Sequence, residues 1–579
     1  MIRFDSVSIR YGVDQEPVIR DINLELADGQ LILVAGRTGS GKSTLLGAIN
    51  GHVPHFTGGI VTGRVEVEGL DTAQHPPRDL AHVIGVVNQN PLAGFVTDIV
   101  EEELAYGMEQ LGIDPQQMRT RVEETLDILG LADLRNRPLR TLSGGQQQRV
   151  AVGSVLATGV RVLVLDEPTS ALDPVSSEEV LAALLRLVHD LGLTVIIAEH
   201  RLERVAGYAD QMLLLDGRGG VTQGETRLIM EASSLVPPVV ALGRIASFPE
   251  VPLSVRDARR MADPIRAALV TKDPGRFRRV PPAQGRSSVR LADPSLKPSG
   301  TQRLEAIESD GLTTKNVRIM YGHTCAVNNV SLSLPPGKIT VIMGRNGSGK
   351  SSLLWALTGV QKMDSGRYSV DGIDLENKGP DKVRDLVRLV PQTACDLLYL
   401  SSVEEECQAA DRESGCESGL CRQILDALAP QVDSRSHPRD LSQGQQLCLV
   451  LAIQLTARPH VILLDEPTRG LDYPAKASLA QILEEMAWEG RSVGVVTHDV
   501  EFAAEVADQI IVMAAGEVIQ SGTAPEVLGT SALFAPQVAK VLYPERWLTA
   551  YQVGQALNLE DSHDDGVHDP RGYESEVSW

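Results

Sequence analysis

Short apolar runs that stop at a glycine or at a polar residue recur along the chain. Two of them end in glycine and lead into stretches compatible with a helix: ILVAG (32–36) before STLLGAIN (43–50), and TVIMG (340–344) before SSLLWALTG (351–359). Four more end in polar residues: VLVLD (162–166), TVIIAEH (194–200), VILLD (461–465) and SVGVVTH (492–498). Strands that are apolar throughout are typical of a parallel sheet with helices on both faces, and such sheets carry their chemistry at the carboxyl ends of the strands. The pattern therefore predicts α/β domains.

These patterns occur twice in the same order, so the chain contains an internal repeat. Three segments return in the second half: GRTGSGKSTLL (36–46) as GRNGSGKSSLL (344–354), TLSGGQQQ (141–148) as DLSQGQQL (440–447), and VLVLDEPTSALD (162–173) as VILLDEPTRGLD (461–472). The offset is 308 residues at Lys42 and Lys350 but 299 at Asp166 and Asp465, so the second copy lacks about nine residues in between. We predict two homologous domains, residues 1–240 and 306–545.

Two segments lie outside these copies. Residues 241–305 are rich in Pro, Ser and Arg, which predicts a solvated linker with one short helix. A contact surface for acidic partners or lipid headgroups is the alternative interpretation of its basic residues. Residues 546–579 end in the acidic stretch NLEDSHDDGVHDPRGYESEVSW, which has no apolar periodicity and predicts a disordered tail.

Charge and hydropathy narrow the classes of function. The formal net charge of −22 argues against a dedicated nucleic-acid binder, so no nucleic-acid partner is expected. No run reaches the roughly 18 apolar residues that a membrane-spanning helix needs, and MIRFDSVSIRYG has no apolar core of a signal peptide. We therefore expect a cytoplasmic chain. If it serves transport, it works at the cytoplasmic face of the membrane, and another polypeptide forms the pore.

All six cysteines lie in the second half of the chain. The expected compartment and the size of the chain argue against a disulfide framework. Cys407, Cys416 and Cys421 have the spacing C-x8-C-x4-C, which matches no common zinc or iron–sulfur pattern. Structural or incidental cysteines are the favoured interpretation, and a metal or redox site is the alternative.

The pattern Gly-x4-Gly-Lys-Ser occurs at 36–43 and at 344–351, each time between a strand and a helix. Glycines let a loop wrap closely around a polyphosphate, and backbone N–H groups at a helix N-terminus face the anion. The lysine reaches the terminal phosphates and the serine hydroxyl ligates Mg²⁺. The predicted ATP-binding residues of the two loops are Gly36, Arg37, Thr38, Gly39, Ser40, Gly41, Lys42, Ser43 and Thr44, and Gly344, Arg345, Asn346, Gly347, Ser348, Gly349, Lys350, Ser351 and Ser352.

Two adjacent carboxylates follow an apolar strand in each copy. Asp166 and Asp465 end their strands, where a carboxylate can hold the Mg²⁺ shell. Glu167 and Glu466 come next and suit the polarisation of an attacking water. The sequence thus predicts ATP hydrolysis with Mg²⁺ as cofactor.

LSGGQ at 142–146, together with the phosphate loops and the Asp-Glu-Pro-Thr segments, resembles the ATP-binding cassette (ABC) ATPases over nearly all of both copies. The resemblance implies two ABC-type P-loop nucleotide-binding domains, each with a RecA-like parallel-sheet core and a helical subdomain. It also implies that the two cassettes of one chain pair head to tail around two ATP molecules, with Asp173 and Asp472 at their contact.

The resemblance assigns further roles to single residues. Gln89, Gln392, His200 and His498 would join Glu167 and Glu466 as catalytic residues, and Tyr11 and Tyr321 would stack on adenine. The implied metal set is Ser43, Gln89, Asp166, Ser351, Gln392 and Asp465. The implied signature residues, which contact the γ-phosphate across the pair, are Ser143, Gly144, Gly145, Gln146, Ser442, Gln443, Gly444 and Gln445.

The signature differs between the copies, because Gly144 is replaced by Gln443. If this position requires a positive φ, glutamine there costs roughly 1–2 kcal/mol relative to glycine. The hypothesis is that the site pairing Lys42 with Ser442 is the weaker of two active sites.

The segments that follow Gln89 and Gln392 indicate the kind of ABC protein. NPLAGFVTDIVEEELAYGMEQLG and PQTACDLLYLSSVEEEC share Val-Glu-Glu-Glu, and this stretch is similar to the ATPase subunits of energy-coupling factor importers of vitamins and transition-metal ions. PLSVRDARR, after the first copy, is similar to the end of those subunits. The resemblance implies a membrane scaffold protein and a small substrate-binding membrane protein as partners. The alternatives are the ATPase of another ABC transporter class, or a soluble tandem-cassette ATPase that acts on ribosomes or nucleic acid.

Overall fold

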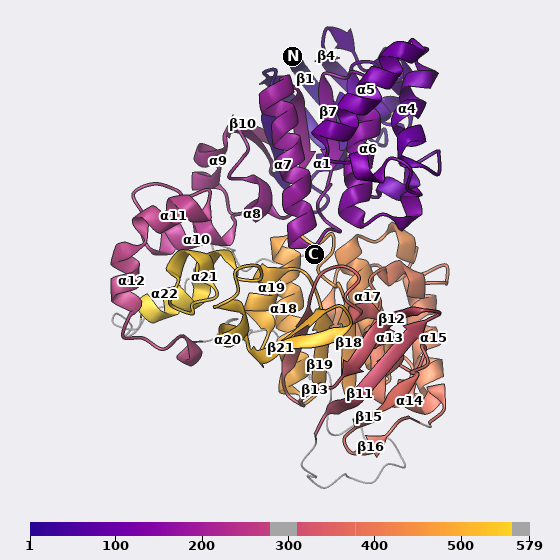
Figure 1. Ribbon diagram of the computed structural model, residues 1–579, viewed down its shortest axis with the longest axis vertical. Coiled ribbons are helices and arrows are strands. Elements are labelled where there is room, and N and C mark those ends of the chain that lie inside the picture. Colours follow the sequence, from indigo (N-terminus) through magenta and orange to yellow (C-terminus); the bar gives the residue numbers. More distant parts are fainter. Residues whose placement is uncertain (278–309, 377, 559–579) are drawn as a thin grey trace. The chain divides into compact units, whose positions relative to one another are not determined.

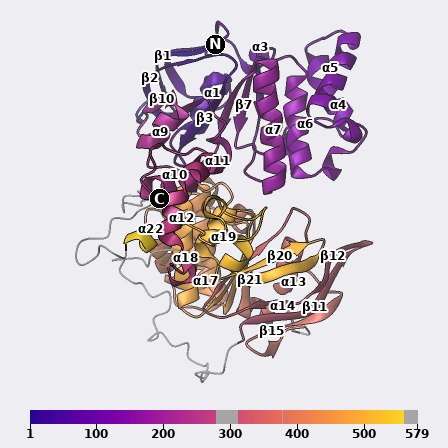
Figure 2. The ribbon, with the colours of Figure 1, turned by 60° about the vertical axis from the view of Figure 1, so that its left-hand side comes forward.

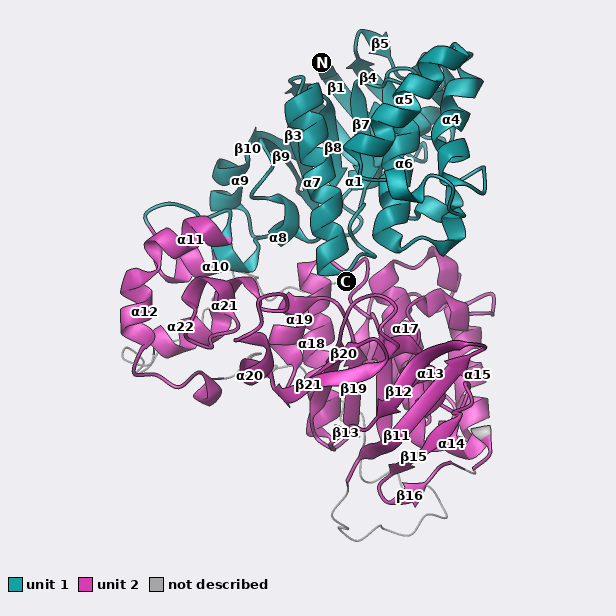
Figure 3. Ribbon diagram, viewed as in Figure 1, with its two compact units in different colours: residues 1–240, 249–254 teal, residues 241–248, 255–579 magenta. Residues whose placement is uncertain are grey.

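The computed structural model describes residues 1–277, 310–376 and 378–558. The chain divides into two compact units (Figure 3): a first unit of residues 1–240 and 249–254, and a second unit of residues 241–248 and 255–579. Each unit contains one copy of the sequence repeat. Both have a mixed α/β fold with a mainly parallel sheet, which confirms the predicted fold class.

A six-stranded sheet forms the centre of the first unit (Figure 1), in the order β10-β9-β3-β8-β7-β6. Five strands run parallel, and β10 pairs antiparallel with β9. The bounds are β3 (Leu31–Gly36), β6 (Ile84–Val87), β7 (Val162–Asp166), β8 (Thr194–Ala198), β9 (Gln211–Leu215) and β10 (Val221–Glu225). The apolar runs of the sequence form the middle of this sheet, and every residue of β3 and β8 is buried.

Helix α1 (Lys42–Ile49) packs between this sheet and a second, antiparallel sheet of order β2-β1-β4-β5, because its apolar residues share one buried cluster with both. The antiparallel strands are β1 (Ile2–Arg10), β2 (Ile19–Leu26), β4 (Ile60–Val67) and β5 (Leu70–Asp71). The remaining helices are α2 (His52–His55), α3 (Pro77–Leu80), α4 (Val100–Gln110), α5 (Pro115–Ile128), α6 (Gly144–Leu156), α7 (Pro174–Leu191), α8 (Leu202–Val205) and α9 (Thr226–Ala232). Of these, α4, α5 and α6 pack on one another as a helical subdomain.

The second unit repeats this plan. Its parallel sheet has the order β17-β18-β19-β14-β20-β21. The bounds are β14 (Ile339–Met343), β17 (Val387–Val390), β18 (Val461–Asp465), β19 (Ser492–Val496), β20 (Gln509–Ala514) and β21 (Glu517–Thr523). The antiparallel strands are β11 (Leu312–Tyr321), β12 (Thr324–Val330), β13 (Ser333–Leu334), β15 (Ser365–Val370) and β16 (Ile373–Asp374). The helices are α13 (Lys350–Leu357), α14 (Pro380–Leu386), α15 (Val403–Ser414), α16 (Leu420–Leu428), α17 (Gln443–Thr456), α18 (Tyr473–Trp488), α19 (Val500–Val506) and α20 (Ala524–Leu528).

Helices from two distant parts of the chain pack together in the second unit. They are α11 (Val255–Met261) and α12 (Asp263–Leu269) from the predicted linker, which follow α10 (Pro238–Ile245), and α21 (Gln537–Leu542) and α22 (Ala550–Asn558) from the end of the chain. Figures 1 and 2 both show α12 beside α22. Arg259 Nε donates to the carbonyl of Lys540 at 2.7 Å, and Arg266 Nη2 donates to the carbonyl of Val541 at 2.6 Å. Lys272 donates to the carbonyl of Ala556.

This packing corrects two predictions. The described part of the predicted linker, residues 241–277, is helical and packed rather than a solvated segment with one short helix. The predicted disordered tail starts too early, because Trp547 and Leu548 are fully buried and α22 extends to residue 558. The Trp547 ring lies 5.5 Å from that of Phe277, so an aromatic pair joins the two segments. Residues 559–579 and the rest of the linker lie outside the described residues.

The segments just before α11 and α22 share a short sequence pattern that is not part of the repeat described above. FPEVPLS (248–254) and YPERWLT (543–549) both read aromatic-Pro-Glu, two variable residues, Leu and then Ser or Thr. The repeat therefore continues beyond the two predicted domains. Among the residues that the structure describes, no helix has both the length and the apolar character needed to cross a membrane.

Candidate functional site

Each predicted phosphate loop joins a central strand to a helix. In the first unit the loop leads from β3 to α1, which begins at Lys42; in the second it leads from β14 to α13, which begins at Lys350. The predicted loop residues, 36–44 and 344–352, therefore lie at the carboxyl end of a strand or in the first turn of the helix. This placement directs the N–H groups of the helix N-terminus to one point, which suits an anion.

Glycine is required directly before each lysine. Gly41 and Gly349 have φ angles of 100° and 94°, which side chains rarely adopt. A Cβ on Gly349 would lie 2.2 Å from the carbonyl oxygen of Ala326, and one on Gly41 would lie 2.9 Å from Val18 Cγ1. The left-handed backbone and the close approach of the neighbouring strand explain why the sequence pattern has glycine here.

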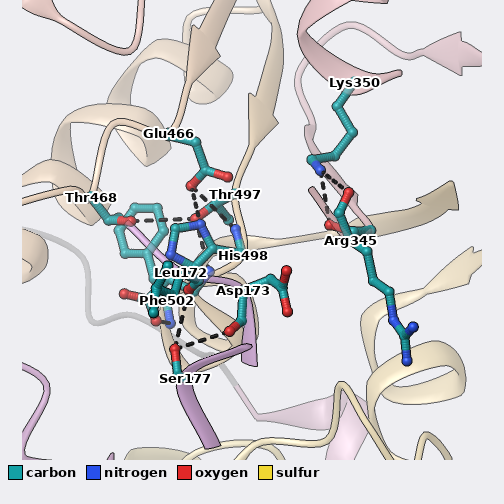
Figure 4. A network of polar contacts seen from close by, with 12 residues as sticks. Leu172, Asp173, Ser177, Arg345, Lys350, Glu466, Thr468, Thr497, His498 and Phe502 are labelled. Carbon is teal, nitrogen blue, oxygen red and sulfur yellow. Dashed lines mark hydrogen bonds and ion pairs between the residues drawn. The ribbon is translucent and has the colours of Figure 1, made fainter. Parts of the chain in front are cut away.

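The loop lysines are buried and folded back over their own loops. Lys42 Nζ donates to the carbonyls of Gly36 at 2.9 Å and Arg37 at 3.0 Å. Lys350 Nζ makes the equivalent bonds to Gly344 and Arg345 at 2.8 and 2.9 Å, and Figure 4 shows the second of them. Both ammonium groups are thus held inside the loop, where they add a full positive charge to the helix N-terminus.

A hydroxyl and a carboxylate converge beside each lysine. Ser43 Oγ donates to Asp166 Oδ2 at 3.1 Å, and Ser351 hydrogen-bonds Asp465. Burial raises the pKa of Asp166, and the charge of Glu167 adds to this effect. Burial raises the pKa of Asp465 to about 6, against the bond from Ser351. Two hard oxygen ligands next to a phosphate site fit Mg²⁺, which binds through one or two carboxylates together with substrate phosphates.

The structure brings Gln89, Glu167 and His200 of the first unit together. His200 Nε2 lies 2.9 Å from Glu167 Oε1, and Gln89 Nε2 donates to Glu167 Oε2 at 3.0 Å and to Ser170 Oγ at 3.2 Å. Glu167 has a φ of 49°, an uncommon angle for a residue with a side chain. Strained backbone of this kind is concentrated at functional sites.

The second unit arranges the equivalent residues differently. Glu466 again has a positive φ, of 50°, but Nδ1 of His498 is the ring nitrogen that meets its carboxylate, at 2.8 Å (Figure 4). The backbone N–H of His498 also donates to Glu466 Oε2 at 3.3 Å. Gln392, the counterpart of Gln89, is exposed. The two sites therefore present their glutamates to different surroundings.

The two predicted adenine-stacking tyrosines are half exposed. Tyr11 shares a hydrogen bond of 3.0 Å with Thr44 Oγ1, and it lines a cavity of about 220 Å³ with Ser43, His52 and Asp166. Tyr321 ends β11 at the corresponding place in the second unit. Tyr11 is thus next to the phosphate loop, within reach of a nucleotide bound there.

The two signature segments have the same conformation. Ser143 caps α6 and Ser442 caps α17, each in a capping box with the glutamine three residues later, Gln146 and Gln445. Gly145 and Gly444 are buried in the first turn of these helices. A capping serine leaves the remaining N–H groups of the helix start for an anion.

The strain predicted at Gln443 is absent. Gly144 and Gln443 are the first residues of their helices, and neither is among the described residues with positive φ. The left-handed residue is instead Gly470, with a φ of 69°, where the first copy has Ala171. A Cβ on Gly470 would lie 1.6 Å from Gln443 Oε1, so the glutamine side chain occupies the space that a larger residue would take. The copies therefore differ by a paired change: the first copy has Gly144 and Ala171, and the second copy has Gln443 and Gly470 at the same two positions.

Asp173 and Asp472 have a clear structural role in their own units. Asp173 caps α7 by accepting from the N–H groups of Val175 and Ser176 at 3.1 and 3.0 Å, and Asp472 caps α18 by accepting from Ala475 at 2.9 Å. Their predicted role at a contact between cassettes stays a prediction.

Sequence reasoning missed a buried polar network behind His200. Glu199 accepts from the N–H and Oγ1 of Thr169 at 3.0 and 2.6 Å. Arg204 donates to the carbonyl of Thr169 at 2.6 Å and to Ser177 Oγ at 2.8 Å. Burial raises the pKa of Glu199, against the bond from Thr169 and the charge of Arg204. This network ties the strand before His200 to the loop after Glu167.

The second unit has an ion pair at the equivalent place. Lys476 Nζ lies 2.6 Å from Asp499 Oδ2, and both side chains are at most 7% exposed. By sequence, Lys476 corresponds to Ser177, and Phe502 replaces Arg204. Thr468 and Thr497 also share a hydrogen bond of 3.3 Å here (Figure 4). The signal in the sequence was a charged residue beside each histidine, Glu199 and Asp499.

Comparisons with known proteins agree with this geometry. The sequence profile of the ABC transporter family matches residues 19–170 and 327–469. A Streptomyces avermitilis protein named "Putative ABC transporter ATP-binding protein" is 51% identical over 564 residues, which cover 96% of this chain and all of that protein. A Methanosarcina mazei protein of the same name is 30% identical over 566 residues, 93% of each chain.

Solved structures extend the likeness to the tandem fold. An archaeal ribosome recycling factor, solved in complex with a ribosomal stalk protein, matches with a TM-score of 0.54 over 90% of this chain and 91% of that one. The identity is 19%, so this match shows the fold alone.

Proposed function

The chain belongs to the ABC transporter family and hydrolyses ATP, and we propose that it is the motor subunit of an energy-coupling factor type importer of a vitamin or transition-metal ion. In this proposal the tandem cassettes form two composite ATP sites and drive separate membrane proteins, a scaffold and a substrate-binding component. The chain would then work at the membrane surface.

The contacts of the first unit support defined roles in hydrolysis. Lys42 and the N–H groups of its loop would bind the terminal phosphates, while Ser43 and Asp166 would hold Mg²⁺. When bound there, the ion would neutralise charge on the phosphates. Glu167 orients the attacking water and accepts its proton, and His200 fixes the Glu167 carboxylate through their 2.9 Å contact. Lys350, Ser351, Asp465, Glu466 and His498 take these roles in the second unit.

The observation that carries the partner proposal is the loop between Gln89 and α4, and its counterpart between Gln392 and α15. The third glutamate of each Val-Glu-Glu-Glu segment is buried and holds its loop. Glu103 accepts from Val96 N, Thr97 N and Thr97 Oγ1 at 2.9–3.1 Å. Glu406 accepts from the N–H groups of Tyr399 and Leu400 at 2.5 and 2.7 Å.

These loops present large apolar side chains to solvent. Leu92 and Val96 are 46% and 61% exposed, and Tyr399 is 79% exposed. A rigidly held loop with exposed apolar residues, directly after the glutamine that contacts the catalytic glutamate, suits the docking of a short helix of a membrane partner. The loop can report the state of the ATP site to that partner, because Gln89 bonds Glu167.

Purification of the chain from membranes in mild detergent tests the partner proposal. We expect integral membrane proteins to co-purify with it, and the variant Val96→Asp/Tyr399→Asp to lose them while the isolated chain retains its ATPase rate. A matched control places aspartate at Trp488, which is 88% exposed in α18. Co-purification of ribosomal proteins would instead support the soluble class, whose tandem fold this chain shares. Full recovery of membrane proteins with the Val96/Tyr399 variant contradicts the docking proposal.

The two ATP sites are proposed to be unequal, with the site that pairs Lys42 with Ser442 the weaker. Two observations support this inequality. The second copy has the paired change at Gln443 and Gly470, and Glu167 and Glu466 have different environments. Strain at Gln443 no longer supports it. Phosphate release is measured for Glu167→Gln, for Glu466→Gln and for the double variant. The double variant should be inactive, and the single variants should differ in residual rate. Equal residual rates contradict the asymmetry, and an active double variant contradicts the catalytic assignment.

A further inference from the structure

The hydroxyl of Ser170 connects Gln89 with Glu167 in the first unit. Gln89 Nε2 donates to Ser170 Oγ at 3.2 Å and to Glu167 Oε2 at 3.0 Å. Ser170 Oγ in turn donates to the carbonyl oxygen of Glu167 at 3.1 Å. The three residues therefore form a closed ring of hydrogen bonds, and Ser170 is the member without a role in the chemistry described above.

The backbone holds this hydroxyl in place. Ser170 is 7% exposed, and its N–H donates to the carbonyl oxygen of Glu167 at 3.3 Å, as its hydroxyl does. The preceding residue, Thr169, is fixed by its bonds with Glu199 and Arg204. The position of the hydroxyl therefore depends on the turn that follows β7 and not on Gln89.

The bonds of Ser170 determine how the side-chain amide of Gln89 is oriented. A hydroxyl has one proton, and Ser170 donates it to Glu167, so Ser170 Oγ can only accept from Gln89. An ionised carboxylate also only accepts. Both acceptors need the NH2 end of the amide, which has two N–H donors. The carbonyl oxygen Oε1 is therefore at the other end of the amide, outside this ring.

This orientation matters to a metal ion. Mg²⁺ takes oxygen ligands, and an amide can ligate it only through the carbonyl oxygen. Gln89 follows Asn88, which lines the same cavity as Ser43 and Asp166, the two residues proposed to hold the ion. The end of the Gln89 amide that the ring leaves over is thus the end that the ion requires.

We propose that Ser170 is a positioning residue, which presents the carbonyl oxygen of Gln89 to Mg²⁺ in the first unit, and that Arg469 prevents the same arrangement in the second. This inference rests on the proposed Mg²⁺ site at Ser43 and Asp166. It is independent of the proposed transport partners.

Ser170 matters most when Glu167 acts on the attacking water. A carboxylate that orients the water and accepts its proton has less capacity left for Gln89. The Ser170 hydroxyl is bonded to the backbone, so it keeps its place in that state and remains the acceptor for the amide. Without it, the Gln89 side chain must be ordered when the metal ion binds, which lowers affinity about two- to tenfold.

The second unit has a different group at this position. Arg469 corresponds to Ser170 by sequence, and its N–H donates to the carbonyl oxygen of Glu466 at 3.2 Å, so the turn is the same. A guanidinium group has N–H donors and no acceptor, so Arg469 cannot accept from the amide of Gln392. It can only donate to the amide oxygen, which is the atom that a metal ion needs. In agreement with this difference, Gln392 is exposed, whereas Gln89 is half-buried.

The test measures metal-dependent nucleotide binding rather than turnover. It uses the full-length chain with Lys350→Ala, so that the phosphate loop of the first unit binds the nucleotide. The nucleotide is a fluorescent analogue of AMP-PNP, which is not hydrolysed, and the readout is the free Mg²⁺ concentration at half-maximal binding. We expect Ser170→Ala to raise this concentration about two- to tenfold. Ser170→Thr keeps the hydroxyl and should stay within about twofold of the parent chain.

A double-mutant cycle separates positioning from a merely structural effect. Gln89→Ala should also raise the half-maximal Mg²⁺ concentration, and Gln89→Ala/Ser170→Ala should raise it no further than Gln89→Ala alone, because the serine acts only through the glutamine. Nucleotide binding without Mg²⁺ should be the same in all three variants. Additive effects, or an unchanged Mg²⁺ requirement in Ser170→Ala, overturn the proposal.

Asp166→Asn in the same Lys350→Ala chain tests the metal site itself. It should raise the half-maximal Mg²⁺ concentration more than Ser170→Ala does, because it removes the charge of a direct ligand. An unchanged Mg²⁺ requirement in Asp166→Asn contradicts the proposed metal site, and the inference with it. If Asp166→Asn responds as expected and Ser170→Ala does not, the inference alone fails.

The second unit provides the matched comparison. In a chain with Lys42→Ala, the phosphate loop of the second unit binds the nucleotide, and Gln392→Ala should change the half-maximal Mg²⁺ concentration by less than about twofold. Ser170→Arg in the first unit copies the second and should have at least the effect of Ser170→Ala. The role of Arg469 is overturned if Gln392→Ala has as large an effect as Gln89→Ala, or if Ser170→Arg leaves the Mg²⁺ requirement unchanged.

Discussion

Replacement of Lys476 by methionine should destabilise the second unit more than any other single change in its ion pairs. The ammonium lies 2.6 Å from Asp499 Oδ2, and the two side chains are 7% and 1% exposed. Methionine has nearly the same length, so the main loss is the charge. Asp499 still accepts from the N–H of Phe502 at 3.1 Å, but its buried carboxylate loses the ammonium group of Lys476.

The magnitude follows from the loss of the Lys476 charge from this buried pair. Removal of one partner of a buried ion pair costs about 3–5 kcal/mol, because the remaining ion still bears its desolvation penalty. At about 2 °C per kcal/mol for a unit of this size, the midpoint of thermal unfolding should fall by about 6–10 °C. Lys476→Met/Asp499→Asn removes both charges and should regain most of the loss.

Intrinsic tryptophan fluorescence reports this change selectively. All four tryptophans, Trp355, Trp488, Trp547 and Trp579, lie in the second half of the chain, and Trp547 is fully buried. Ser177→Ala, at the corresponding position of the first unit, is the control and should leave the fluorescence midpoint unchanged. The reasoning is refuted if Lys476→Met shifts the midpoint by less than about 1 °C, or if the double variant unfolds as early as the single one.

Four further predictions concern the sites. Gly349→Ala should lower the midpoint of thermal unfolding, followed by tryptophan fluorescence, by at least 2 °C more than Gly347→Ala. Both residues have a positive φ, but only at Gly349 would a Cβ also meet the backbone of Ala326. Equal shifts contradict this. The pKa of Asp465 is about 6 in the native chain and about 3.9 in the unfolded chain, so the native state binds a proton at this carboxylate more tightly. The stability of the metal-free protein should therefore fall as the pH rises from about 4.5 to above 6. Asp465→Asn should lose this part of the slope, and an unchanged pH profile contradicts the assignment. Arg204→Phe should lower phosphate release, because Thr169 and Ser177 lose the hydrogen bonds from Arg204. The combination Ser177→Lys/Glu199→Thr/Arg201→Asp/Arg204→Phe copies the second unit and should regain part of the rate. A rate below that of the single variant contradicts the equivalence of the two networks. In unfolding followed by tryptophan fluorescence, Gly470→Ala should cost about 1–2 kcal/mol from its left-handed backbone, and Gln443→Gly should reduce that cost by removing the side chain that a Cβ would meet; additive effects contradict the paired change.

The sequence was sufficient for the fold and for the residues next to the phosphate loops. Short continuous apolar runs such as 162–166 are typical of strands that are buried on both faces. The pattern Gly-x4-Gly-Lys-Ser after such a run is typical of a phosphate-binding loop. The structure accordingly places Lys42, Ser43 and Asp166 within one small region. Their catalytic and metal-binding roles stay predictions that the proposed variants test.

The polar networks behind the histidines could not be predicted in the same way. Glu199, Arg204, Thr169 and Ser177 come from three segments with no shared spacing, and the second unit uses residues of different charge at the same places. Only the three-dimensional packing shows that they meet. The sequence also could not show whether residue 443 has a helical or a positive φ, and the expected cost of glutamine there applied only to a positive φ.

The end of the chain was misread for a different reason. Its acidic composition suggested disorder from residue 546, but Trp547, Val553 and Ala556 are buried. A few apolar residues suffice for order when another segment supplies the surface they cover. That segment, α11 and α12, is far away in the sequence, so local composition gave no sign of it.

The packing of α11 and α12 against the end of the chain also sets an order of events during protein synthesis. The hydrogen bonds of Arg259, Arg266 and Lys272 span 281, 275 and 284 residues. At about 5–20 residues per second, a ribosome needs roughly 15–60 s to make that length. During this interval α11 and α12 have left the ribosome without the surface that they finally cover. Chaperones that bind exposed apolar helices therefore have a defined time, and a defined segment, in which to act on the nascent chain.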